Sequence, residues 1–208
     1  MNARSTPVSR RRPGGRSARV NAAVLTATTD ELADRGLANL SLDSVARRAG
    51  VHKSTIYRRW GTRDRLILEL LREQAAVTVP VPDTGSLRQD LIELARAAVA
   101  NAASPVVEPI IRAVISELPH DTAVADTARQ FWEERMSLDG EIIKRAIARG
   151  EIAPNTDPRA AIEAILGPLQ LRLLITGEPA NERTITNIVD LLLGGLAEPT
   201  THKTLSHR

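Results

Sequence analysis

The stretch from Ser41 to Trp60, SLDSVARRAGVHKSTIYRRW, constrains the fold more than any other part of the chain. Two short amphipathic segments flank an Ala-Gly-Val turn, and the second segment is rich in cations and hydroxyl groups. Gly50 can supply the positive φ that a sharp turn between two helices favours. This layout is typical of a helix-turn-helix, whose second helix enters the major groove of DNA.

Apolar spacing predicts a three-helix head around this motif. We expect a first helix over residues 17–35, a second helix capped by Ser41, and a third over residues 53–59. Helical spacing then leaves Ser54, Tyr57 and Arg58 on one outward face. A solvated basic face on a small core helix is the alternative. The inward anchors are expected to be Val20, Val24, Ala27, Leu32, Leu42, Val45, Ala49, Val51, Ile56 and Trp60.

Composition and charge support this interpretation. Hydrophobic residues make up 42% of the 208 residues, aromatics only 2%, and the apolar spacing is mostly three or four, which predicts an all-α protein. Residues 1–65 carry a net charge of +9 and residues 66–208 a net charge of −6. A basic head on an acidic body indicates a polyanionic partner for the head. The alternative is a merely solvated basic surface.

The N-terminal segment is Arg- and Pro-rich without apolar periodicity, and we expect residues 1–15 to form a disordered basic arm. Arg10, Arg11 and Arg12 are candidates for the narrow minor groove, although a solvated tail explains them equally well. No secretory signal, cysteine or run of the ~18 to 20 apolar residues needed for a membrane span is found. A cytoplasmic protein with no membrane partner is therefore expected.

From Val24 to Leu66 the chain resembles the DNA-binding head of the TetR family of bacterial regulators, through VLTA, LADRG, SLDSVARRAGV, TIYRRW and TRDRL. Three positions depart from the family pattern. Glu31 stands where an apolar residue is usual, His52 replaces a Ser or Thr cap, and Trp60 replaces a common Phe. The second departure leaves the start of the third helix open.

The resemblance implies roles for the residues of the head. Base-edge contacts would come from Lys53, Ser54 and Tyr57. In the family, the helix that follows, expected here over residues 63–77, links movement in the body to the spacing of two heads. Phosphate contacts would come from Ser41, Thr55, Arg58, Arg59 and Arg63.

The rest of the chain predicts a larger helical body. VPVPDTG is the clearest breaker, so the head with its linker helix is expected over residues 16–80, the body over 81–197 and a flexible tail over 198–208. Phe131, Leu138, Ile142 and Ile143 are expected to face inward, and Pro168 to kink or break its helix. The body helices are expected over residues 86–103, 105–118, 121–149, 158–176 and 181–196.

The last two helices are apolar nearly all round, which indicates burial against the body and against a second subunit. A homodimer also suits a DNA reader, because two heads about 34 Å apart can read a palindrome. A central core helix in a monomer is the alternative. The predicted dimer residues are Ile162, Leu166, Leu169, Leu173, Ile188, Leu192 and Leu196.

Signatures of catalysis are missing, so we expect no enzyme, no cofactor and no metal. The chain has no Gly-rich phosphate loop and no Gly-x-Ser-x-Gly elbow, and no histidine has a partner at metal-ligand spacing. The family resemblance implies a small-molecule pocket in the body, although plain core packing explains its apolar members as well. Its expected lining is Arg112, Phe131, Trp132, Arg135, Met136 and Gln170.

The combined features predict a dimeric, sequence-specific transcriptional repressor that leaves a palindromic operator on double-stranded DNA when a small molecule enters the body. Two alternatives stay open: an architectural DNA-binding dimer without an effector, and a protein-interaction module with a basic head.

Overall fold

The computed structural model of the chain describes residues 15–197. The predicted tail, and all of the predicted arm except Gly15, lie outside this range. The predicted all-α fold is confirmed, with no strand among the described residues. The elements in order are α1 (Gly15–Arg35), α2 (Leu42–Arg48), α3 (Lys53–Arg59), α4 (Arg63–Thr78), α5 (Leu87–Ala102), α6 (Val107–Glu117), α7 (Thr122–Arg149), α8 (Pro158–Gln170), the π-helical turn η1 (Leu171–Thr176) and α9 (Glu182–Ala197).

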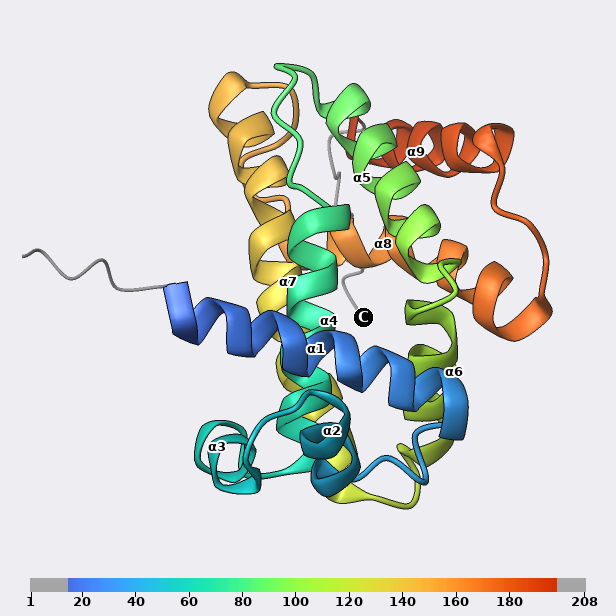
Figure 1. Cartoon of the computed structure of the whole chain (residues 1–208). Helices are drawn as coiled ribbons and strands as arrows, with labels where there is room; N and C mark the ends of the chain where they lie inside the picture. The colour runs from blue at the N-terminus through green and yellow to red at the C-terminus, as the bar shows by residue number, and fades with distance from the viewer. Residues whose placement is uncertain (1–14, 198–208) are drawn as a thin grey trace, which may run out of the picture.

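Helices α1, α2 and α3 lie together with the start of α4 (Figure 1), and they form the head because their apolar residues are buried in one cluster. Ser41 caps α2 by accepting a hydrogen bond from the Ser44 N–H at 3.1 Å, as predicted. Gly50 turns the chain with φ of +65°. At the centre of the cluster lie Val24, Val45, Ala46, Ile56 and Leu66.

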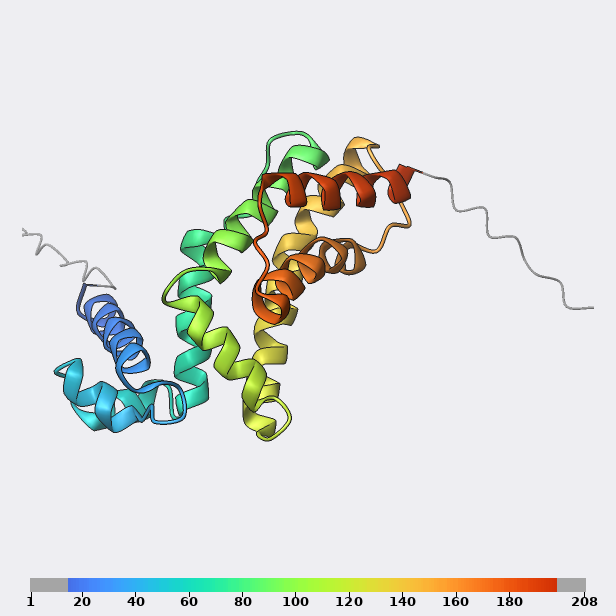
Figure 2. The ribbon, with the colours of Figure 1, turned by 90° about the vertical axis from the view of Figure 1, so that its right-hand side faces the viewer.

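Two elements connect the head with the body. Helix α4 runs out of the head and packs along α7, where Arg72 holds Glu134 with two hydrogen bonds. Helix α6 inserts Ile110, only 1% exposed, into the head's own apolar cluster. The head therefore lies at one end of an elongated molecule and α9 lies near the other (Figure 2).

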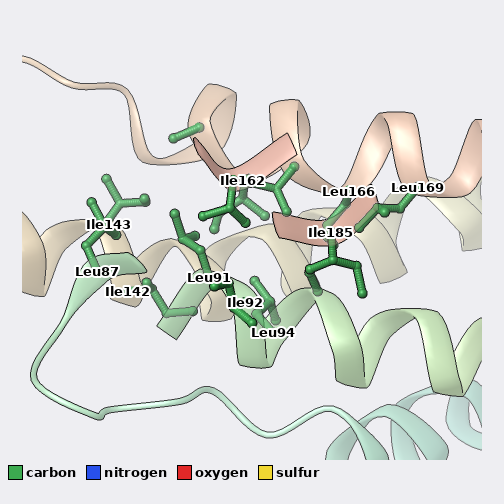
Figure 3. Close-up of a cluster of buried hydrophobic side chains, with 14 of the residues drawn as sticks. Leu87, Leu91, Ile92, Leu94, Ile142, Ile143, Ile162, Leu166, Leu169 and Ile185 are labelled. Carbon is green, nitrogen blue, oxygen red and sulfur yellow. The ribbon is translucent and has the colours of Figure 1, made fainter. Parts of the chain in front are cut away.

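The body core lies between α5, α7, α8 and α9, with inward-facing Leu and Ile from each helix (Figure 3). Ile142 and Ile143 of α7 are fully buried, as predicted, and Phe131 is partly buried. The prediction for Leu138 was wrong, because its side chain is 54% exposed. The spacing from Phe131 carries Leu138 to the outer edge of the helical stripe, whereas Asp139 faces inward and is buried.

Pro168 does not end its helix at once. Helix α8 continues to Gln170 and then changes to the wider π-helical turn η1. Because proline has no N–H, the α-helical hydrogen-bond pattern is interrupted there, and a π turn is one way for the chain to continue.

Within residues 15–197, no single helix is both long and apolar enough to cross a bilayer. By length and composition alone, α5 and α6 pass that test as a pair, although they are bent by 81° with respect to each other.

Candidate nucleic-acid interface and ligand cavity

Helix α3 begins at Lys53, where the sequence predicts it, because His52 acts as its cap. The imidazole Nδ1 accepts a hydrogen bond from the Ser54 N–H at 3.2 Å and lies 2.7 Å from the Ser54 hydroxyl. A ring nitrogen with a free lone pair satisfies a helix N–H as a hydroxyl oxygen does. The departure at His52 therefore leaves the recognition helix intact.

The outer face of α3 presents its polar side chains to solvent. Lys53, Ser54, Tyr57 and Arg58 are all exposed, and Tyr57 is half exposed at 50%. On the opposite face, the fully buried Ile56 fixes the helix against the head core. The tyrosine ring and the flanking cations are thus accessible to a ligand as large as a DNA duplex.

One acidic residue, which sequence reasoning missed, contacts this face. Asp43 of α2 forms an ion pair with Lys53, and the two side chains keep exposed fractions of 37% and 56%. The Lys53 hydrogen bond, with smaller contributions from Tyr57 and Arg47, lowers the pKa of Asp43 against a partial burial effect that raises it. Asp43 therefore carries its negative charge beside two side chains expected to read bases.

The predicted phosphate contacts fall into two groups. Arg58 is exposed and makes no ion pair among residues 15–197, Thr55 is partly buried, and the Ser41 hydroxyl is hydrogen-bonded to Ser44 in the cap of α2. The other two cations are engaged: Arg59 lies 4.9 Å above the Trp60 ring and donates to Ser17, while Arg63 pairs with Asp64 at 3.1 Å and lies 3.8 Å from Asp121. The predicted contacts Arg10, Arg11 and Arg12 lie outside the described residues.

The departure at Glu31 has a structural explanation. Its carboxylate is 3% exposed and accepts an ion pair from Arg48 at 2.9 Å, with Arg35 at 3.5 Å. Arg48 also binds Asp34 at 2.5 Å. The buried acid thus joins α1 to α2, which an apolar residue at this position could do only by packing.

A cavity of about 430 Å³ lies in the body, within the range of small-molecule sites. Its wall comes mainly from α4, α5, α6, α7, α8 and η1, so one partly open cavity touches both the linker helix and the body. Among the predicted lining residues, those that do line the wall are Phe131, Trp132, Arg135 and Gln170.

Two predicted lining residues lie elsewhere. Met136 is buried in the body core and does not line the cavity. Arg112 does not line it either. Its guanidinium reaches across to the π-helical turn and donates to the carbonyl oxygens of Leu174 at 2.8 Å and Leu173 at 3.2 Å.

A buried ion pair stands in the cavity wall. Arg135 donates through Nε to Asp139 at 2.9 Å and through a second nitrogen to the other carboxylate oxygen. Asp139 is 0% exposed, and burial raises its pKa in spite of the opposing effect of Arg135. The two residues are one turn apart on α7, which brings the fork-shaped guanidinium directly onto the carboxylate.

The predicted dimer residues are mostly internal. Ile162, Leu166 and Leu169 are buried in the core that α8 shares with α5 and α9 of the same chain (Figure 3), and their contact with a partner stays a prediction. Leu166 and Leu169, together with Leu173, also line the cavity. The leucines of α8 are therefore buried within the core of this chain. The remaining three, Ile188, Leu192 and Leu196, are half-buried against the same core.

The outward face of the last two helices carries other residues. Ala164, Gly167 and Leu171 lie along α8 and its continuation, all exposed. Leu191 on α9 is 77% exposed, and a Cβ added at Gly194 would meet no atom within 4 Å. Small and apolar side chains are therefore exposed on both of the last two helices.

Among residues 15–197 no three His, Asp or Glu side chains are grouped so as to hold a metal ion.

Comparison with known proteins identifies both parts. A model described as "Bacterial regulatory proteins, tetR family" matches residues 24–70, and one for "Tetracyclin repressor-like, C-terminal domain" matches residues 81–192. The regulator AqdR of Rhodococcus erythropolis is 33% identical over 86% of each chain. The "DNA-binding transcriptional repressor TetR" of Mycobacteroides abscessus is 33% identical over 86% of this chain and 94% of its own length.

Solved structures agree in fold. The crystal structure of the TetR-family regulator SCO0332 superposes with a TM-score of 0.74 at 31% identity, over 86% of this chain and 100% of that one. These relatives, matched over most of their length, are named as transcriptional regulators. The chain belongs to the TetR family of bacterial regulatory proteins and is a DNA-binding regulator of transcription.

Proposed function

We propose that the protein is a homodimeric repressor that holds a palindromic operator with two copies of α3 and leaves it when a small molecule occupies the body cavity. The head would comprise residues 16–80 and the body residues 81–197. The proposal rests on one arrangement: the Lys53–Arg58 face of α3 is exposed, and the next helix, α4, runs from this head to the cavity and lines it.

The base-reading role rests on side-chain chemistry and exposure. Lys53 can donate to guanine O6 and N7, and the Tyr57 ring can lie against a thymine methyl group. Ser41, Thr55, Arg58, Arg59 and Arg63 supply hydroxyls and cations for phosphates. Arg63 would have to exchange its bonds with Asp64 and Asp121 for a phosphate, so its contact depends on the position of α4.

Substitution of Tyr57 tests this role. An operator is first selected from random-sequence DNA with the wild-type protein. Tyr57→Ala should then weaken operator binding at least about tenfold, since a good base contact is worth about 1–3 kcal/mol. Tyr57→Phe separates the hydroxyl from the ring. The fold should persist because Tyr57 is half exposed. Unchanged operator affinity of Tyr57→Ala would refute the base-reading role.

The same selection separates the alternatives. An enriched palindrome supports a two-fold reader. DNA binding without any enriched sequence would favour an architectural protein, and the absence of DNA binding would favour a protein-interaction module with a basic head.

The outward face of α8 and α9 supports a dimer. Leu171 and Leu191 are exposed on these helices, as are the small residues Ala164, Gly167 and Gly194, and small residues permit two helices to approach closely. A second copy packed there would place the two heads at the same end of the two-fold axis, one on each side of it.

The cavity supports effector control. Ile67, Leu71 and Ala75 of α4 line it, so an occupant that enlarges it would push on the helix that carries the head. Operator release on addition of a cavity ligand tests this step. A ligand that binds without changing operator affinity would favour the architectural alternative.

A further inference from the structure

The wall of the body cavity is hydrocarbon except for a few polar side chains, and only two of those are buried. Asp64, Asn101, Thr127, Arg129 and Gln170 all keep contact with solvent at the cavity's edges. Arg135 and Asp139 alone are buried and polar. Any group that orients a ligand deep in this cavity therefore has to interact with this pair.

The geometry of the pair decides which groups it can accept. Asp139 takes hydrogen bonds from Nε and one terminal nitrogen of Arg135. The other terminal nitrogen of Arg135, Nη1, has no acceptor among residues 15–197. Guanidinium nitrogens only donate, so this end of the pair offers N–H groups and no lone pair.

Charge restricts the ligand further. The guanidinium and the carboxylate neutralise each other, so the pair as a whole does not call for a counter-ion. A ligand carboxylate on Nη1 would place a second negative charge close to Asp139 in surroundings of low polarity, where like charges repel strongly. A carbonyl oxygen meets the same donors without that repulsion.

The remaining wall indicates the rest of the molecule. Aliphatic side chains such as Ile67, Leu71 and Ile111 make up most of it, and Phe131 and Trp132 stand edge to face with ring centres 5.3 Å apart. We propose that the effector is an uncharged, largely aliphatic molecule with one carbonyl oxygen, which accepts hydrogen bonds from Arg135 Nη1. This inference names the ligand class of the cavity and so rests on the proposed effector site.

Matched probes test the class directly. 2-Undecanone and decanoate have similar chains and differ in the charge of the oxygen-bearing end. Binding is followed by tryptophan fluorescence in a Trp60→Phe background, which leaves Trp132, in the cavity wall, as the single tryptophan. The ketone should bind at least about tenfold more tightly than decanoate, because both accept from the same donors but only the carboxylate is repelled by Asp139 and has to lose the hydration of a charge.

Two variants change the pair in opposite ways. Asp139→Asn keeps the shape but leaves the guanidinium charge uncompensated, so the order should reverse and decanoate should bind more tightly. Because an unpaired buried arginine can destabilise the fold, the double variant Arg135→Met/Asp139→Leu provides a second test. It should lose about tenfold in affinity for 2-undecanone while its thermal unfolding stays close to that of the parent.

Four results would overturn the proposal: decanoate binding the parent as tightly as the ketone, failure of the ketone to bind, an order unchanged by Asp139→Asn, or undiminished ketone affinity in the double variant. None of these measurements uses DNA. Release of the operator by decanoate alone would leave effector control standing and refute only the ligand class. Ketone binding without operator release would support the ligand class and refute effector control.

Discussion

Asp43 places a negative charge at the edge of a surface that has to approach phosphates. Its ion pair holds the Lys53 ammonium group on the protein in the absence of DNA. A lysine side chain that is free binds any phosphate it can reach, whereas one held by a carboxylate needs a better partner to leave it. We therefore expect Asp43 to raise sequence discrimination at the cost of general affinity.

Asp43→Asn should thus bind random-sequence DNA more tightly than the wild type and discriminate less well in favour of the operator. With Lys53 free to reach one more phosphate, the slope of log K against log salt should steepen by about 0.9 for each head bound to DNA. Titrations by fluorescence anisotropy at several salt concentrations measure both effects.

Asp83→Asn is the matched control. It removes the same charge from Asp83, an exposed residue of the loop before α5 that pairs with Arg145 of α7. Equal salt slopes for Asp43→Asn and the wild type would show that Lys53 is not restrained in solution.

Glu31 is buried, and its binding partner Arg48 is partly exposed. Arg48→Met leaves the carboxylate with only the longer Arg35 contact, which should cost about 2 kcal/mol of unfolding free energy. Glu31→Leu/Arg48→Met should recover more than half of that loss, because no buried charge then remains. Urea denaturation measures both values.

Asp34→Asn removes the other, exposed partner of Arg48 and should change stability by at most about 0.5 kcal/mol. If Arg48→Met were no more destabilising than Asp34→Asn, the Glu31 pair would contribute nothing to holding α1 on α2.

Single residues also show what sequence can predict. Helical spacing alone placed Val24 and Ile56 inside the head and Tyr57 outside it, because burial on a helix follows a fixed period. Pairs such as Asp43–Lys53 join residues on different helices, and no local pattern reports them. Leu138 was misplaced because spacing gives the centre of a stripe more reliably than its edge.

At the scale of elements, α4 and α7 are joined by a two-pronged pair. Arg72 donates to both oxygens of Glu134, and this hydrogen bond lowers the pKa of the carboxyl group below its usual 4.5. Because folding lowers this pKa, the pair stabilises the fold at pH values above the pKa of the unfolded state. The stabilisation is lost as the pH falls through the pKa of the folded state.

The melting temperature of wild type should therefore exceed that of Glu134→Gln at neutral pH, and the gap should close as pH falls below about 4.5. Both side chains are partly exposed, so we expect no more than about 1 kcal/mol, or roughly 2–4 °C. Glu133→Gln is the control, because Glu133 is the exposed neighbour without an ion pair among residues 15–197. A gap that stays constant with pH would contradict the assignment.

Element boundaries were predicted to within a few residues, because Ser41, Gly50 and Gly150 act locally as caps and turns. The fate of Pro168 was less accessible. Its missing N–H predicts a break, but whether the chain kinks or widens into a π turn depends on neighbours such as Arg112, which binds the carbonyls of that turn.

At the scale of the whole molecule, the apolar sequence of α8 did not reveal which surface this helix would pack against. The leucines of α8 face α5 and the cavity, and the candidate dimer face consists of small residues that carry little hydrophobic signal. Only the packing of α5, α7 and α9 around α8 distinguishes these two faces.

Ala164→Glu should abolish the proposed dimer, since two copies would bring two carboxylates together at a closely packed contact. Sedimentation equilibrium should then give the mass of one chain, and operator affinity should fall at least about a hundredfold because one head reads half a site. Ala100→Glu introduces the same charge at an exposed alanine of α5 and should leave the mass unchanged. An Ala164→Glu variant that stays dimeric would place the interface elsewhere.

Ile110 has a consequence for anyone who would recombine such regulators. It belongs to α6 by chain connection and to the head by packing, where it lies with Leu66, Ile67 and Leu70. A chimera that joins this head to a foreign body at residue 80 would lack Ile110 and leave a gap in the apolar cluster of the head. A biosensor built that way would lack this contact between its DNA-binding head and its ligand-binding body. Swaps in this protein therefore need to carry α6 along with the head.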